Sequence, residues 1–219
     1  MSEYEYRHSQ PSCSHEVLEP ALRRLLARQP KGSRICDLGC GNGALMGSMV
    51  DRGWNLTGID SSTSGIAIAA TTWPSVHWYA GDVTGQLPTA LFENSFDVVI
   101  STEVIEHLYF PRSLAINAFK LLKPGGRFIL STPYHGYLKN VALAATGTFD
   151  RHFTALWDHG HIKFFSRRTL YELLRGAGFV DLAFVGAGRL PFLWKSMIVD
   201  ARKPTCAGSS PLDRGMANA

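Results

Sequence analysis

The sequence predicts an α/β protein with one open, mostly parallel sheet and helices on both faces. Short apolar runs rich in β-forming residues alternate along the chain with segments of helical period, as strands joined by helical crossovers do. Most of these runs are continuously apolar, which is typical of strands buried on both faces. A sheet of this kind binds its ligand at the carboxyl ends of the strands, near the first strand.

The chain has 219 residues, 45% hydrophobic and 11% aromatic, so it holds enough apolar material for one folded domain. We predict a flexible segment over residues 1–14, the folded domain over 15–203 and a disordered tail over 204–219, because both ends are polar or rich in turn-forming residues. The net charge of +4 is low for a dedicated nucleic-acid binder, so a nucleic-acid partner is not expected.

The apolar runs are far shorter than the ~20 residues that cross a bilayer, and no apolar stretch of a secretion signal follows Glu3, Glu5 and Arg7. We therefore expect no membrane partner and a cytoplasmic location. The cysteines are few and scattered, so reduced thiols are expected. They are Cys13, Cys36, Cys40 and Cys206.

The first half of the domain alternates helix and strand. One stripe of leucines predicts an amphipathic helix over 15–28. A buried strand over 34–38 runs into glycines, and a helix over 44–52 ends at Gly53. The following predicted elements are a strand over 55–59, a helix over 64–72, and strands over 76–80 and 96–101.

The second half begins with a helix whose first turn accommodates Pro111 and which reaches Leu122, where Lys123-Pro124-Gly125-Gly126 ends it. A strand over 127–131 follows. Ser166 is the expected N-cap of a helix through Arg175, with Gly178 just past its end. Two last strands are predicted near 180–187 and 192–202.

A glycine-rich loop follows the first strand, with Gly39, Gly41 and Gly43 at alternate positions. Such a loop brings backbone amides close to a ligand, where side chains would prevent the approach. Asp60 ends the next strand, 21 residues after Gly39, where a carboxylate can accept both hydroxyls of a ribose. The pair indicates a nucleoside ligand. The spacing from Gly39 to Ala44 also fits a dinucleotide, and a glycine turn without a ligand remains an alternative.

Three further motifs accompany this loop: Gly81-Asp82, Phe96-Asp97-Val98-Val99 and Leu122-Lys123-Pro124-Gly125-Gly126. With the Asp37-x-Gly39-x-Gly41-x-Gly43 loop and Asp60, they make residues 30–200 resemble the class I S-adenosylmethionine-dependent methyltransferases. The resemblance implies a Rossmann-like sheet of seven strands, the last antiparallel, and S-adenosylmethionine as the cofactor.

By the same resemblance, the glycine loop would lie under the methionine part of the cofactor and Asp60 would hold the ribose. Asp82 and the amide of Val83 would hold the adenine, whose amino group needs an acceptor; the alternative for Asp82 is a solvated turn carboxylate. The implied cofactor-binding residues are Asp37, Gly39, Cys40, Gly41, Asp60, Ser61, Asp82, Val83 and Glu103.

A second cluster, Glu103-Val104-Ile105-Glu106-His107, follows the fourth strand. If it opens a helix, Glu103, Glu106 and His107 share one face, and two crowded carboxylates repel unless a proton or a cation relieves them. With the later His161, the pattern is similar to metal-dependent ribose 2′-O-methyltransferases of small RNAs and to part of the ubiquinone-pathway O-methyltransferase group.

That resemblance implies that Glu103, Glu106, His107 and His161 hold a divalent cation, which would lower the pKa of an acceptor hydroxyl. Without a metal, Glu106 would be a buried partner for an amide, and His107 a core or acid–base imidazole. In either case His107 and His161 are the candidate catalytic residues.

Residues 133–163 hold too many aromatic side chains for a simple exposed loop, so we predict a small helical lid over an acceptor pocket. The alternative is that these helices only cover the sheet. An apolar lid favours a small-molecule acceptor. We therefore expect transfer of a methyl group from S-adenosylmethionine to an oxygen, rather than a nitrogen or carbon, of a small molecule.

Two alternatives remain open. One is a metal-dependent RNA 2′-O-methyltransferase. The other is a non-catalytic cofactor-binding module or a small NAD-dependent oxidoreductase. The sequence leaves the acceptor and the oligomeric state undetermined.

Overall fold

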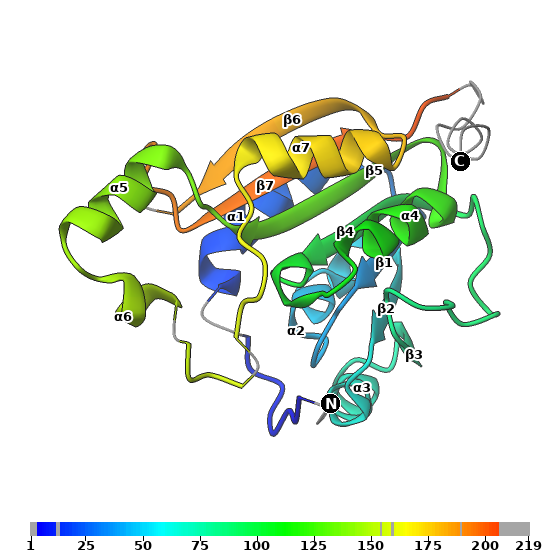
Figure 1. The fold of residues 1–219 in the computed structure, drawn as a ribbon. Coiled ribbons are helices and arrows are strands. Elements are labelled where there is room, and N and C mark those ends of the chain that lie inside the picture. The colour runs from blue at the N-terminus through cyan, green and yellow to red at the C-terminus, as the bar shows by residue number, and fades with distance from the viewer. Residues whose placement is uncertain (1–3, 12–13, 154, 159, 189, 206–219) are drawn as a thin grey trace, which may run out of the picture.

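A computed structural model describes residues 4–11, 14–153, 155–158, 160–188 and 190–205. Its centre is a seven-stranded sheet with the order β3-β2-β1-β4-β5-β7-β6 (Figure 1). The first five strands pair in parallel, and β7 is antiparallel to β5 and to β6, as predicted for the last strand. The strands are β1 (Arg34–Leu38), β2 (Asn55–Asp60), β3 (His77–Ala80), β4 (Phe96–Thr102), β5 (Leu122–Pro133), β6 (Val180–Ala187) and β7 (Ser196–Arg202).

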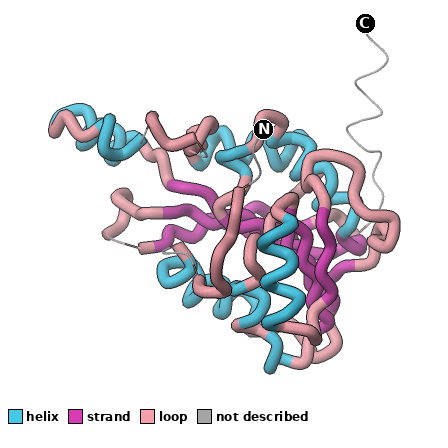
Figure 2. Tube along the Cα trace, turned by 90° about the horizontal axis from the view of Figure 1, so that it is seen from below, coloured by secondary structure: helices cyan, strands magenta, loops and turns pink. Residues whose placement is uncertain are grey.

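Helices cover both faces of the sheet, which confirms the predicted α/β class (Figure 2). The helices are α1 (His15–Leu26), α2 (Ala44–Gly47), α3 (Thr63–Thr72), α4 (Pro111–Leu121), α5 (Tyr137–Ala145), α6 (Phe149–Phe153) and α7 (Arg167–Gly176), with 3₁₀ turns η1 (Val50–Arg52) and η2 (Ile105–His107). Apolar residues of α1 and α2 form one buried cluster, and those of α4 and α7 form the other, on the opposite face. Within the described residues, every helix falls short of the length and apolar character that a membrane crossing requires.

Two predicted elements differ from the structure. The helix expected over 44–52 divides into α2 and η1, because the hydroxyl of Ser48 donates to the carbonyl of Leu45 (2.8 Å) at the break. The strand expected from Arg127 already begins at Leu122, which pairs with Phe96 across an irregularity in the β4–β5 register. The Lys-Pro-Gly-Gly motif therefore lies inside a bent strand and not between two elements.

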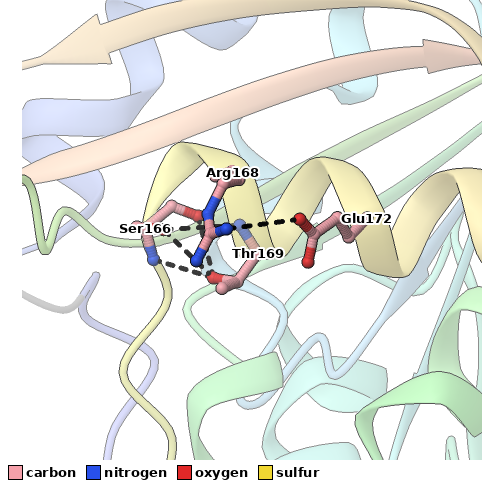
Figure 3. A network of polar contacts seen from close by, with 4 residues as sticks. All are labelled: Ser166, Arg168, Thr169 and Glu172. Carbon is pink, nitrogen blue, oxygen red and sulfur yellow. Dashed lines mark hydrogen bonds and ion pairs between the residues drawn. The ribbon is translucent and has the colours of Figure 1, made fainter.

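The predicted N-cap of α7 is confirmed as a full capping box (Figure 3). The hydroxyl of Ser166 accepts from the amide of Thr169 (3.3 Å), and the hydroxyl of Thr169 accepts from the amide of Ser166 (3.0 Å). Arg168 and Glu172 form an exposed ion pair one turn apart (4.0 Å). These local contacts fix where α7 begins, directly after the segment that carries His161.

The parallel strands end at one edge of the sheet, and the candidate residues follow them there. The loops after β1, β2, β3 and β4 begin at Gly39, Ser61, Gly81 and Glu103. The segment after β5 carries the two helices α5 and α6, which extend away from the sheet (Figure 1). Residues 133–163 are thus partly helical; their role as a lid stays a prediction.

Candidate active site

The loop after β1 has the backbone that its glycines predict. Gly39, Gly41 and Gly43 have φ angles of 85°, 55° and 79°, a region that side chains with a Cβ rarely adopt. A Cβ at Gly39 would also collide with the side chain of Val104. The sequence therefore needs glycine at these positions to fold the loop and to leave its surface free of side chains.

We expected the backbone amides of this loop to face a ligand, but three of them form hydrogen bonds within the protein. Those of Gly39 and Cys40 donate to the carbonyl of Ile59 (2.8 and 3.0 Å), and that of Gly41 donates to Asp60 Oδ2 (2.7 Å). The amides therefore hold the loop against β2. The buried thiol of Cys40 lies beneath the loop, and burial raises its pKa.

Asp60 is fixed at the carboxyl end of β2. Its Oδ1 accepts from the amide of Ser62 (2.8 Å), and the hydroxyl of Ser62 in turn caps α3 by accepting from the amide of Gly65 (3.1 Å). Ser61, another of the implied cofactor-binding residues, is exposed beside it. A carboxylate held by two backbone amides keeps a fixed direction toward a diol.

Asp37 is buried in β1, with 1% of its surface exposed. Its Oδ1 lacks a hydrogen-bond partner among the described residues. Burial, and then the charge of Asp60, raise the pKa of Asp37 to about 7. An unpaired acceptor oxygen beneath the glycine loop suits a cationic donor, which the methionine ammonium of S-adenosylmethionine provides.

Asp82 is exposed after β3, and its Oδ1 accepts from both the amide and the hydroxyl of Thr84 (2.8 Å each). Val83 beside it is buried. Asn117 of α4, which the sequence analysis did not single out, donates from Nδ2 to the carbonyls of Val83 (2.9 Å) and Gly85 (3.0 Å). Asn117 thus fixes this turn from beneath. The sequence signal that could have identified Asn117 is its position, as a polar residue, on the apolar face of the helix predicted after Pro111.

The N-terminal residues 4–11 lie across the glycine loop, within the segment that we predict to be flexible. The amide of Tyr6 donates to the hydroxyl of Ser64 (3.0 Å). The side-chain amide of Asn42 donates to the carbonyls of His8 (2.8 Å) and Gln10 (2.9 Å). Three loop or helix contacts therefore hold this segment in place.

The ring of Tyr6 fills space that two glycines leave open. A Cβ at Gly41 would lie 2.8 Å from Tyr6 Cζ, and a Cβ at Gly65 would lie 2.9 Å from Tyr6 Cδ2. Burial, and then the charge of Asp60, raise the pKa of the Tyr6 hydroxyl, so it remains protonated. Tyr6 therefore packs against the glycine loop and the first turn of α3.

After β4 the chain turns sharply at Glu103, whose φ of 53° is unusual for a residue with a side chain. Its Oε1 accepts from the hydroxyl of Ser131 (2.8 Å) and its Oε2 from that of Ser196 (3.2 Å). Burial raises the pKa of Glu103. The two serines, from β5 and β7, direct this carboxylate toward the sheet.

Glu106 is fully buried in η2. Its Oε2 accepts from the hydroxyl of Thr132 (3.0 Å), while its Oε1 has no partner among the described residues. Burial, and then the charge of Glu103, raise its pKa. The carbonyl of Glu106 accepts from the amides of Ile162 and Lys163 (2.9 Å each), which brings the segment around His161 to η2.

His107 and His161 lie together, with ring centroids 4.9 Å apart. Ligand atoms of Glu106, His107 and His161 all lie within 4.8 Å of one another. Glu103 is not part of this group. It precedes η2, which is a 3₁₀ turn and not the helix that would place Glu103, Glu106 and His107 on one face. Burial, and then the charge of His107, lower the pKa of His161 to about 4, so its imidazole is neutral at pH 7.

Residues 6–183 match the family described as a methyltransferase domain, and the chain belongs to this family. It is a class I S-adenosylmethionine-dependent methyltransferase domain, with the Rossmann-like sheet that the sequence motifs predict. The alternatives of a non-catalytic module and an NAD-dependent oxidoreductase are therefore set aside.

Several curated relatives are ubiquinone biosynthesis O-methyltransferases. That of Psychrobacter arcticus is 30% identical over 184 residues, which cover 77% of this chain and 68% of the relative. That of Caulobacter vibrioides is 37% identical over 138 residues, or 60% of this chain and 54% of the relative. The chain matches between 38% and 54% of the length of four such relatives.

Solved structures support the same fold. The [4+2]-cyclase SpnF has a TM-score of 0.68 at 19% identity, over 93% of this chain and 87% of that chain. An S-adenosylmethionine-dependent methyltransferase from Mesorhizobium loti has a TM-score of 0.67 at 21% identity, over 85% of this chain and 97% of that one. At these identities the likeness concerns the fold alone.

Proposed function

We propose that the protein transfers the methyl group of S-adenosylmethionine to an oxygen atom of a small-molecule acceptor. The observation that carries this proposal is the cluster of Glu106, His107 and His161 beside the end of β4. A hydroxyl is a poor nucleophile until it loses its proton, and this cluster offers a neutral imidazole and a buried carboxylate to receive that proton. The O-methyltransferase relatives support the same reaction.

The cofactor side of the site has a defined role for each residue. Bound S-adenosylmethionine supplies an electrophilic methyl group on a sulfonium. Asp37 would accept from the ammonium, Asp60 would accept from the ribose hydroxyls, and Asp82 with Val83 would face the adenine. Glu103 and Tyr6 would border the methionine end, and together they restrict the position of the methyl group.

On the acceptor side, His161 would take the proton of the acceptor hydroxyl as that oxygen receives the methyl group that bound S-adenosylmethionine supplies. The neutral imidazole of His161 would become positively charged, and the chain would not have to stabilise an oxyanion. Most of the rate enhancement would come from holding the two reacting centres together in a site from which water is excluded.

A divalent cation also fits this cluster. Glu106, His107 and His161 would hold it, and it would lower the pKa of the acceptor hydroxyl. One carboxylate and two imidazoles suit Mn²⁺, Fe²⁺, Co²⁺ or Zn²⁺ better than Mg²⁺. The unpaired Oε1 of Glu106 is the feature of this structure that favours a cation.

The exposed apolar side chains of the segment after β5 favour a small organic acceptor over an RNA. Tyr137, Leu138 and Trp157 are 81%, 54% and 48% exposed, and such residues do not form the basic track that a phosphate backbone needs.

Methyl transfer from labelled S-adenosylmethionine to matched hydroxyl and amine acceptors tests the proposal. We expect product with hydroxyl acceptors only. Product with amines alone would contradict it. The same assay with EDTA, followed by addition of Mn²⁺, distinguishes a site that holds a cation from a metal-free site. Activity that is lost with EDTA and restored by Mn²⁺ would indicate a cation. An unchanged rate would indicate that His161 acts as the base without a metal.

A further inference from the structure

A cavity of about 560 Å³ lies between α5, α6 and residues 190–193, apart from the glycine loop. We call it the α5–α6 pocket. Its size is that of pockets which hold small organic ligands. Its lining includes four apolar residues, Ala142, Leu143, Leu190 and Leu193, and two basic ones, Lys139 and His152.

The walls of this pocket leave apolar surface in contact with water. Leu190 and Leu193 are 71% and 40% exposed. Helix α5 is reversed in polarity, because Leu138 is exposed while the neighbouring Lys139 is 6% exposed. A helix that only covered a sheet would turn its apolar side chains inward and its lysine outward. The arrangement instead suits an apolar ligand with a group that a buried cation can contact.

Lys139 connects the pocket to the candidate active site. Its Nζ donates to the carbonyl of Tyr134 at the end of β5 (2.8 Å), and its side chain also lines the pocket. Burial raises the pKa of Glu103, and the positive charge of Lys139 partly opposes this rise; burial, His107, His152 and Lys139 together lower the pKa of His161.

His152 forms the second connection. Its ring lies 5.6 Å from that of His135, between centroids. His135 is 6% exposed, and its Nε2 has no partner among the described residues. The charges of His152 and Lys139 both lower the pKa of His161. A ligand in the pocket would therefore meet an environment that is apolar on one side and basic toward the active site.

We propose that the α5–α6 pocket binds the non-reacting part of the methyl acceptor, and that this acceptor is an amphipathic organic anion. Its apolar body packs against Leu143, Leu190 and Leu193, and its anionic group lies at Lys139. The hydroxyl to be methylated then points toward His161. This assignment rests on the proposed function, because it names the substrate class of the same site.

Two fluorescent probes of nearly the same shape test the pocket directly. Anilinonaphthalene sulfonate carries an anionic group, and N-phenylnaphthylamine is its uncharged counterpart. We expect the sulfonate to bind the full chain at one site, about tenfold more tightly than the amine, since a charge-assisted hydrogen bond stabilises only the former. Equal affinities would overturn the proposal.

Substitutions locate the probe. Lys139→Met should bring the affinity for the sulfonate down to that for the amine, without changing the latter. Leu193→Asp should weaken both probes. Leu156→Asp is the matched control, because Leu156 is 99% exposed and outside the pocket lining. Unchanged binding in Leu193→Asp would contradict the assignment. Because Lys139 is buried and its loss can unfold the chain, Leu190→Asp, at an exposed position, gives an independent second test.

A pair of acceptors separates failure of the pocket from failure of the proposed function. A hydroxy acid should be methylated with a kcat/KM about tenfold above that of its methyl ester, and Lys139→Met should abolish the difference. Equal methylation of the acid and the ester would support the proposed O-methyl transfer and contradict the proposed role of the α5–α6 pocket. Probe binding without methylation of any hydroxyl would retain the pocket as an anion site and overturn the function. Loss of probe binding as dimers form in sedimentation would assign the surface to a second copy and overturn the proposal.

Discussion

The backbone amide of Gly41 donates to the carboxylate of Asp60 at 2.7 Å, so the glycine loop and the end of β2 form one unit. This contact joins the ends of β1 and β2 before any ligand binds. The carboxylate holds the loop, and by our proposal its remaining lone pairs would also accept from the ribose hydroxyls.

Replacement of Asp60 should weaken binding of S-adenosylhomocysteine by about 1–3 kcal/mol, because Asp60→Ala leaves the ribose hydroxyls without an acceptor and releases the amide of Gly41. Titration calorimetry measures the change. Asp51→Ala, at an exposed position in η1, is the control and should bind normally. Unchanged affinity in Asp60→Ala would refute the ribose assignment.

The affinity for S-adenosylhomocysteine should rise with pH. Asp37 has a pKa raised to about 7, and the ammonium of the ligand stabilises its charged form, so binding releases a proton below that pH. Between pH 6 and pH 8 we expect about a tenfold gain in affinity, one pKa unit being a factor of ten. Asp37→Asn should bind more weakly and show a flat profile. A flat profile in the unmodified protein would contradict the placement of the ammonium.

The same raised pKa predicts a trend in stability. The unliganded fold retains the Asp37 proton at pH values where the unfolded chain has lost it, so the free energy of unfolding should fall as pH rises from about 4 to about 7 and level off above. Chemical denaturation of the unmodified protein and Asp37→Asn measures it. The free energy of unfolding of Asp37→Asn should depend less steeply on pH, because the contribution of Asp37 is absent.

Loss of Asn117 should affect both stability and cofactor binding. Asn117→Leu leaves the carbonyls of Val83 and Gly85 without their buried donor, which we expect to lower the free energy of unfolding by about 1–3 kcal/mol and to weaken S-adenosylhomocysteine binding. Lys120→Ala, exposed on the same helix, should change neither. A loss of stability with normal affinity would limit Asn117 to a structural role.

His161 should act in the chemical step and not in cofactor binding. We expect His161→Ala to lower kcat by about 100-fold or more while leaving the affinity for S-adenosylhomocysteine unchanged. His77→Ala, at an exposed position in β3, serves as the control. Equal losses of rate and of affinity in His161→Ala would indicate a folding role.

The sequence predicted the sheet, the backbone of the glycine loop and the start of α7 well because their signals are local. The glycines after β1 and the N-cap Ser166 act through their own backbone or through residues three positions away. The break between α2 and η1 was missed because it depends on a single hydroxyl that competes for a backbone carbonyl.

The parts of the site that sequence reasoning missed all depend on contacts between distant segments. Ser131 and Ser196 meet at Glu103 only because β7 inserts beside β5, and Tyr6 reaches Gly41 from a segment that shows no periodic pattern. No spacing rule in one chain predicts such encounters. The cluster of Glu106, His107 and His161 was predicted by resemblance, while the position of Glu103 outside it follows from a turn that the sequence did not reveal.

The strand order places the proposed cofactor site and the proposed acceptor site on opposite sides of β4. The loops proposed to bind the cofactor follow β1, β2 and β3 on one side of β4, while α5, α6 and residues 190–193 follow β5 or join β6 to β7 on the other side. Grafting a foreign segment over residues 134–158, which leaves His161 in place, should therefore yield chimeras that still bind S-adenosylhomocysteine and accept a different methyl acceptor.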